Sequence, residues 1–127
     1  MSGGEPFAYA PLRVVPNIER GEAINVGVVL FCRRAGFLGL RWTLPTARLA
    51  ALDPALDRDS LAAHLEALQR TAAGELRAGP IALQPPSERF HWLVAPSSTI
   101  VVAGDVHTGI TADPQATLDH LFATLVQ

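Results

Sequence analysis

The chain has 127 residues, of which 49% are hydrophobic, and its formal net charge is −2. A chain of this length is typical of one domain that buries roughly two-thirds of the surface of its unfolded state. No stretch approaches the roughly 20 consecutive apolar residues of a membrane-spanning helix, and the net charge supplies no basic field for nucleic acid. The composition predicts a soluble single domain over residues 1–127 with a flexible tail at 1–6. It argues against a membrane or a nucleic acid as partner.

Two further features of the composition bear on location and partners. The opening sequence MSGGEPF has no basic segment followed by an apolar run, so we expect a cytoplasmic protein. The only cysteine, Cys32, lies in an apolar segment, which excludes an internal disulfide and a multi-cysteine metal site and predicts a buried thiol. All ten basic residues are arginine, but a chain this rich in Ala, Arg, Gly and Pro is typical of a GC-rich genome. The arginines alone therefore indicate no ligand.

The first third of the chain predicts three antiparallel strands. Residues 7–15 alternate imperfectly, and Pro11, which lacks an amide hydrogen, places this strand at an edge or at a bulge. Residues 24–32 are almost wholly apolar and rich in Val and Ile, as in a central strand that is buried on both faces. A tight hairpin at 33–36 leads into a third strand at 37–42.

Two helices are predicted next. Thr46 is a candidate cap for a short helix that ends at residue 52. A longer helix begins near Asp57 or Asp59, either of which can cap it, and its leucines recur at helical spacing. Because proline cannot continue a helix, we expect this one to end at Gly79, before Pro80.

The last third predicts two strands and a final helix. Residues 81–88 are expected to be an extended connector, 90–94 a fourth strand and 99–103 a strongly β-branched fifth strand. Residues 105–109 leave the sheet as a polar loop. A final helix begins after Asp113 as its cap, with a proline in its first turn.

This order, βββααββα, predicts a fold of the α+β class. Consecutive strands joined by hairpins form antiparallel sheets, and helices grouped between them pack on the sheet rather than connecting parallel strands. We therefore expect a mainly antiparallel sheet of about five strands with the helices packed on one face.

Two polar clusters are candidates for a binding site. If the fifth strand lies beside the first hairpin, their arginines, hydroxyls and one imidazole converge on a patch that suits an anion. In the alternative interpretation, Arg13 pairs with Glu22 or Glu19 across the hairpin, and His107 only holds a loop. The candidate ligand-binding residues are Arg13, Glu19, Arg20, Glu22 and Asn25 in the first cluster, and Ser98, Thr99, His107 and Thr108 in the second.

Motifs of known chemistry are absent from the sequence. There is no glycine-rich phosphate loop before a helix, no serine in a nucleophile elbow and no histidine pair at metal-ligand spacing. We therefore expect no metal and no cofactor, and the sequence favours a protein that is not an enzyme. If there is catalysis, His107 is the candidate general acid or base.

Three blocks of sequence carry a resemblance to a known family. LRVVPNIERGEAINVGVVLFC, RFHWLVAPSSTIVV and VHTGITADPQATLDHLF resemble, in this order, the bacterial family catalogued as domain of unknown function 3037. The resemblance implies a bacterial protein, some of whose relatives are encoded beside a kinase similar to the toxin of toxin–antitoxin pairs. It supplies no reaction. Where relatives carry a bulky aromatic after the Gly-Glu pair, this chain has Ala23, which leaves the wall of any pocket there looser.

Two functional hypotheses follow. The first is a small binding or regulatory module that acts through protein contacts, as a homodimer or with a neighbouring kinase-like protein. The second is an enzyme or sensor for a phosphorylated small molecule or nucleotide, in which Arg13 and Arg20 grip the anion and His107 handles a proton. The first is favoured because no catalytic motif appears.

Overall fold

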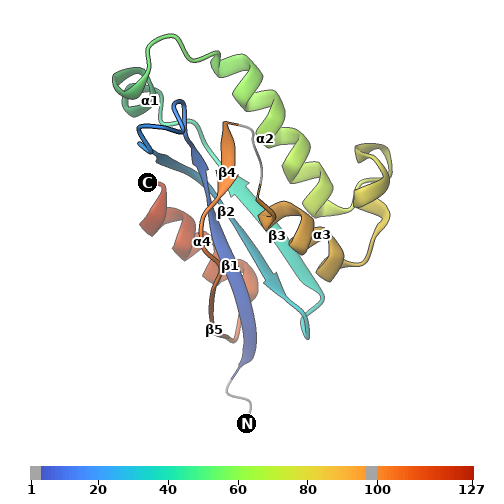
Figure 1. Cartoon of the computed structure of the whole chain (residues 1–127). Coiled ribbons are helices and arrows are strands. Elements are labelled where there is room, and N and C mark those ends of the chain that lie inside the picture. The colour runs from blue at the N-terminus through green and yellow to red at the C-terminus, as the bar shows by residue number, and fades with distance from the viewer. Residues whose placement is uncertain (1–3, 97–99) are drawn as a thin grey trace.

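Figure 1 shows the computed structural model, which describes residues 4–96 and 100–127. The predicted α+β class with a five-stranded antiparallel sheet is confirmed: β3, β2 and β1 are neighbours in this order, and β4 and β5 both pair with the far side of β1. The elements are β1 (Glu5–Val14), β2 (Ile24–Cys32), β3 (Phe37–Trp42), α1 (Thr46–Leu52), α2 (Arg58–Ala73), the 3-10 turns η1 (Leu76–Ala78) and η2 (Pro80–Leu83), α3 (Pro86–Val94), β4 (Val101–Ala103), β5 (His107–Thr111) and α4 (Pro114–Leu125).

The centre of the sheet is β1 and β2, as the apolar run at 24–32 predicts. On one face, Val28, Leu30 and Cys32 are fully buried against α4. On the other face, Ala10 and Leu12 pack in a larger cluster with α1, α2 and α3. A strand that is apolar on both faces needs cover on both, so this sequence selects a central position in the sheet.

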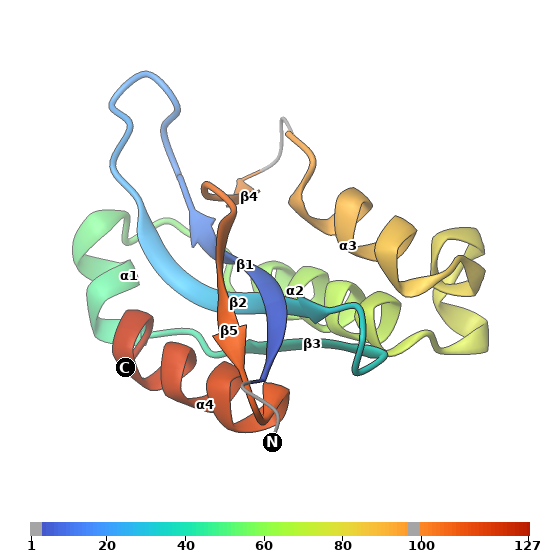
Figure 2. The same cartoon turned by 90° about the horizontal axis from the view of Figure 1, so that it is seen from below.

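Helices therefore cover both faces of the sheet, and the prediction that they pack on one face is wrong (Figures 1 and 2). The reason lies in the residues of α4. Leu118 and Phe122 are buried against β2, and the guanidinium of Arg41 on β3 lies 4.3 Å from the centre of the Phe122 ring. The last helix thus covers the face of β2 that α2 and α3 leave open.

Three predicted segments are wrong in type. The extended connector predicted at 81–88 contains most of η2 and the first residues of α3. Residues 90–94 belong to helix α3 and not to a strand, because Pro86 occupies its first turn and Phe90 and Leu93 are buried at helical spacing. The predicted loop at 105–109 contains most of β5, where Thr108 and Ile110 suit a strand. The predicted order βββααββα otherwise holds, with α3 as an additional helix before the last two strands.

The bounds of α2 follow local capping. The Asp57 side chain accepts a hydrogen bond from the backbone amide of Ser60, and the hydroxyl and amide of Ser60 lower the pKa of this carboxyl. The helix ends at Gly74, whose φ of 73° is the left-handed conformation that terminates helices, and not at Gly79 as predicted. Thr46 lies inside α1, whose N-cap is Pro45, so it is not the predicted cap.

The edge of the sheet that β4 and β5 form is interrupted by a bulge close to Pro11 of β1. Gly104 lies opposite Pro11 and donates its amide hydrogen to the Pro11 carbonyl (2.8 Å), while His107 lies opposite Tyr9. Two residues, 105 and 106, therefore oppose Ala10 alone, which makes a β-bulge between β4 and β5. The missing amide of Pro11 points at this bulge, where the ladder is interrupted, so a proline is tolerated in a central strand.

Cys32 is a free, fully buried thiol, as predicted. Its sulfur lies 3.5 Å from the Pro6 carbonyl. Within residues 4–96 and 100–127, no helix combines the length and the apolar content needed to cross a membrane.

Candidate functional site

The connection between β1 and β2 carries three of the nine predicted site residues, Glu19, Arg20 and Glu22, and projects from the sheet (Figure 2). Asn17 shapes it, because its side-chain oxygen accepts hydrogen bonds from the backbone amides of Glu19 (3.0 Å) and Arg20 (3.3 Å). Gly21 has a φ of 74° and no atom near the place of a Cβ, so it supplies the turn. The turn is thus fixed within the connection itself, by the Asn17 side chain and by the backbone conformation of Gly21.

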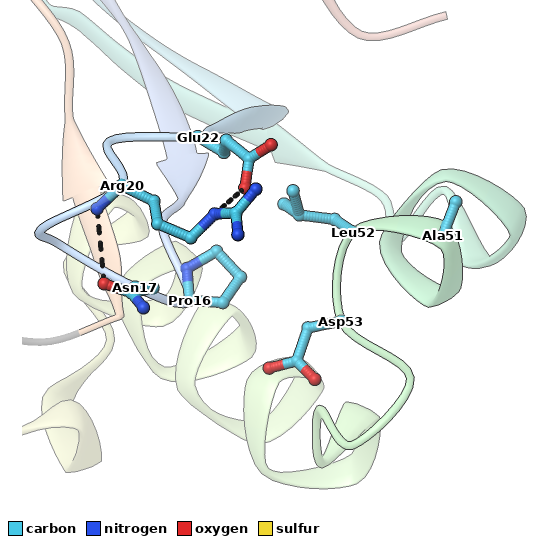
Figure 3. Close-up of a pocket in the computed structure, with 7 residues that line it drawn as sticks. All are labelled: Pro16, Asn17, Arg20, Glu22, Ala51, Leu52 and Asp53. Atoms are coloured by element: carbon cyan, nitrogen blue, oxygen red, sulfur yellow. Dashed lines mark hydrogen bonds and ion pairs between the residues drawn. The ribbon is translucent and has the colours of Figure 1, made fainter.

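One side of the connection faces the end of α1 across a hollow of about 310 Å³, which we call the Arg20 hollow (Figure 3). Its arginine is already paired: Nε of Arg20 lies 2.7 Å from Oε1 of Glu22, and this hydrogen bond and charge raise the pKa of Arg20. Asp53 adds a second carboxylate from the opposite wall. The charged lining therefore sums to about −1, which does not suit an anion.

Arg13 lies in a different place and makes a different contact. The bulge at Val26 sets Asn25 opposite Arg13 in the sheet, and Nε of Arg13 donates to Oδ1 of Asn25 (3.1 Å). The amide of Asn25 donates in turn to the carbonyl of Leu125 in the last turn of α4 (3.1 Å). The predicted pairing of Arg13 with Glu19 or Glu22 does not form.

A second hollow, of about 500 Å³, lies beside Arg13, and we call it the Arg13–Arg48 hollow. Arg48 of α1 lines it as well and donates a hydrogen bond to the carbonyl of Val126 (2.6 Å). No carboxylate is among the described residues that line it. Sequence reasoning missed Arg48 because it lies 23 residues from Asn25 in a helix without a motif, and only the fold brings it to the site.

The predicted convergence of Arg13, Arg20 and His107 is wrong. His107 pairs with Tyr9, four residues or ~13 Å along β1 from Arg13, and Arg20 lies farther still along the connection. The imidazole rests on the Tyr9 ring, with 5.3 Å between ring centres. Thr108 lies opposite Ala8 and is exposed. The remaining predicted site residues, Ser98 and Thr99, lie outside the described residues.

The two edges of the sheet are protected unequally. At β3, Gln69 of α2 donates from Nε2 to the carbonyl of Leu40 (3.0 Å) and accepts a hydrogen bond from Nε1 of Trp42 (3.2 Å). At β5, no side chain from the described part of the chain hydrogen-bonds to the backbone of residues 107–110. Val106 and Ile110 are 46% and 65% exposed, and residues 106–112 contain no charge and no proline. Natural edge strands are usually protected from pairing by a covering segment, by charged side chains or by proline.

No cluster of three His, Cys, Asp or Glu side chains that would hold a metal ion occurs among the residues with described positions. Comparison with known proteins gives one result. The model of a family described as "Protein of unknown function (DUF3037)" matches residues 9–126, which is nearly the whole chain. No curated protein and no solved structure matches the chain.

Proposed function

We propose that this chain, which belongs to the DUF3037 family of proteins of unknown function, is a small binding module that acts through protein contacts at the β5 edge. Its partner in this proposal is a second copy of the same chain, and its setting is the bacterial cytoplasm. The observation that carries the proposal is the unequal protection of the two sheet edges: Gln69 occupies the β3 edge, and among residues 4–96 and 100–127 no side chain occupies β5 in the same way.

The backbone of β5 has groups available for pairing. Val15 donates to the Ile100 carbonyl and Gly104 to the Pro11 carbonyl, so the odd-numbered residues of β1 point their amides and carbonyls toward this edge. Residues 107, 109 and 111 lie opposite odd-numbered residues and therefore point back to β1. The amides and carbonyls of Thr108 and Ile110 consequently point outward.

A second copy fits this edge by two-fold symmetry. Antiparallel pairing about Thr108 places Thr108 opposite Thr108 of the other copy and Ile110 opposite Val106. The two exposed apolar side chains are then covered, Thr–Thr pairs are favourable across strands, and no like charges face each other. The interface is small, so we expect a micromolar dissociation constant.

Sedimentation velocity over a concentration series tests the proposal. The wild type is expected to shift from monomer to dimer in the micromolar range. Ile110→Lys is expected to remain monomeric, because a lysine at an edge strand opposes pairing. Ile18→Lys is the matched control: Ile18 is 69% exposed on the β1–β2 connection, and this variant should dimerise like the wild type.

Two results would contradict a second copy as the occupant: a wild type that stays monomeric at high micromolar concentration, or equal loss of dimer in both lysine variants. A second experiment tests whether a different protein binds the β5 edge. The wild type is mixed with the kinase-like protein that the family resemblance suggests as a genomic neighbour. A mixed complex that Ile110→Lys abolishes, together with a monomeric wild type, would assign the edge to that partner instead.

A further inference from the structure

We infer that the Arg13–Arg48 hollow binds the phosphate group of a small molecule. This site lies at the C-terminal end of α4, where β1, β2 and α1 meet, and it makes no use of β5. The inference is independent of the proposed function, and it uses neither Arg20 nor His107.

The charge of the hollow is the first argument. Arg13 and Arg48 bring two positive charges, and neither forms a salt bridge within residues 4–96 and 100–127. The last carbonyls of α4 offset only about half a charge, as expected for the end of a helix. The hollow therefore keeps a surplus of positive charge that the described residues do not neutralise.

The second argument is that both guanidinium groups are held in place. Arg13 is fixed through Asn25 to the carbonyl of Leu125, and Arg48 is fixed to the next carbonyl, that of Val126. Each arginine uses only one donor nitrogen in these contacts, and a guanidinium has five N–H groups. The donors that remain are positioned in advance, so a ligand does not have to order long, mobile side chains.

The guanidinium of Arg13 is also packed. A Cβ at Gly104 would lie 3.0 Å from Cζ of Arg13 and 3.2 Å from one of its terminal nitrogens. The side chain thus lies against the backbone of Gly104, which has left room for it. A structure that buries part of an arginine in this way, without a carboxylate partner, favours a ligand that completes its hydrogen bonds.

The geometry favours phosphate over carboxylate. A carboxylate is planar and is satisfied by one guanidinium fork, whereas a phosphate monoester carries close to two charges and presents oxygens in several directions. Two arginines from different elements match a phosphate monoester, because they can contact its oxygens from two directions. Ala23 and Ile24 line the same hollow, so an apolar wall is present beside the charges for the rest of an ester.

Titration followed by two-dimensional amide NMR tests the site, with inorganic phosphate, phenyl phosphate and acetate at constant ionic strength. Both phosphates are expected to shift the side-chain amide of Asn25 and the backbone amide of Leu125, and acetate is not. Arg48→Gln should weaken phosphate binding roughly tenfold, the loss of one charge-assisted contact. Arg77→Gln removes the same charge from an exposed position in η1 and should leave binding unchanged.

Arg48 is exposed, so its variant is expected to fold, and the amide spectrum itself verifies this. Stronger binding of phenyl phosphate than of inorganic phosphate would identify an ester as the ligand, and equal binding would identify free phosphate. Shifts that are absent, or that Arg77→Gln weakens as much as Arg48→Gln, would overturn the inference. Sedimentation of Arg48→Gln separates the two proposals, because this variant should retain the wild-type oligomeric state.

Discussion

The Arg20 hollow and the Arg13–Arg48 hollow flank the same connection and contain the same kind of cation, yet their electrostatics are opposite. Arg20 is exposed and paired with a carboxylate two residues away, at 2.7 Å. Arg13 is half-buried and bonded to the neutral side chain of Asn25. The difference shows that the availability of an arginine for a ligand depends on its neighbours, and not on how many arginines a stretch of sequence contains.

The partners of the two arginines also differ in what they stabilise. The pair of Arg20 and Glu22 lies within the connection and is exposed, and exposed pairs of this kind contribute little to folding. Asn25 and Arg48, by contrast, bond to carbonyls at the end of α4 that have no partner inside the helix. The Arg13–Arg48 hollow is therefore part of the packing of the fold as well as a candidate binding site.

The largest expected effect is that of Asn25→Ala. This change leaves the carbonyl of Leu125 and Nε of Arg13 without partners in a half-buried place, so we expect a loss of about 2 kcal/mol in the free energy of unfolding. Asn17→Ala, on the side of the Arg20 hollow, is the matched control and should cost about 0.5 to 1 kcal/mol, because Asn17 only fixes an exposed turn. Urea denaturation of both variants measures the difference. Equal losses would erase the structural contrast between the two hollows.

Gly104→Ala is expected to have the next largest effect. The new Cβ would lie 2.8 Å from Cγ of Pro11 and 3.0 Å from Cζ of Arg13, and the proline ring is held in a central strand. The backbone of Gly104 does not require glycine, so any loss reports this crowding alone. We expect about 1 to 2 kcal/mol lower stability, measured by urea denaturation, and weaker phosphate binding. A more stable variant, the usual result when an unstrained glycine becomes alanine, would show that Arg13 does not occupy that space.

The sequence predicts the fold better than the site. Long segments with a clear period, such as the apolar run at 24–32 and the leucines of α2, have the structure that their pattern indicates. The strand predicted at 90–94 is wrong: Phe90, Trp92 and Val94 alternate as in a strand, but Pro86 before them begins a helix. Alternation over five residues is too short to decide between the two.

The prediction of the candidate site differs from the structure for another reason. The sequence places Arg13 and Asn25 in one cluster, and the hairpin does bring them together, but the partner that it suggests for Arg13 is Glu19 or Glu22 and not Asn25. It cannot show that the bulge beside Gly104 carries β5 along β1, so that His107 ends up opposite Tyr9 and away from the connection. Arg48 belongs to the site only because the fold brings it within hydrogen-bond distance of the Val126 carbonyl after α4, which no local pattern encodes.

The smallest effect on stability is expected from Glu22→Gln, and this variant tests the comparison most directly. The exposed pair that it breaks contributes little, so the denaturation midpoint should hardly move. The substitution, however, raises the charge of the Arg20 hollow by one unit and leaves the guanidinium of Arg20 without its carboxylate partner. If a neighbouring carboxylate is what disqualifies this hollow, phosphate should now shift the amides of Asn17 and Arg20 in NMR spectra, where it leaves those of the wild type unmoved. Arg20→Gln combined with Glu22→Gln restores the charge and should abolish the gained shifts. No gain in Glu22→Gln would mean that Asp53 or the shape of the hollow, rather than the paired Glu22, keeps anions out of this side of the connection.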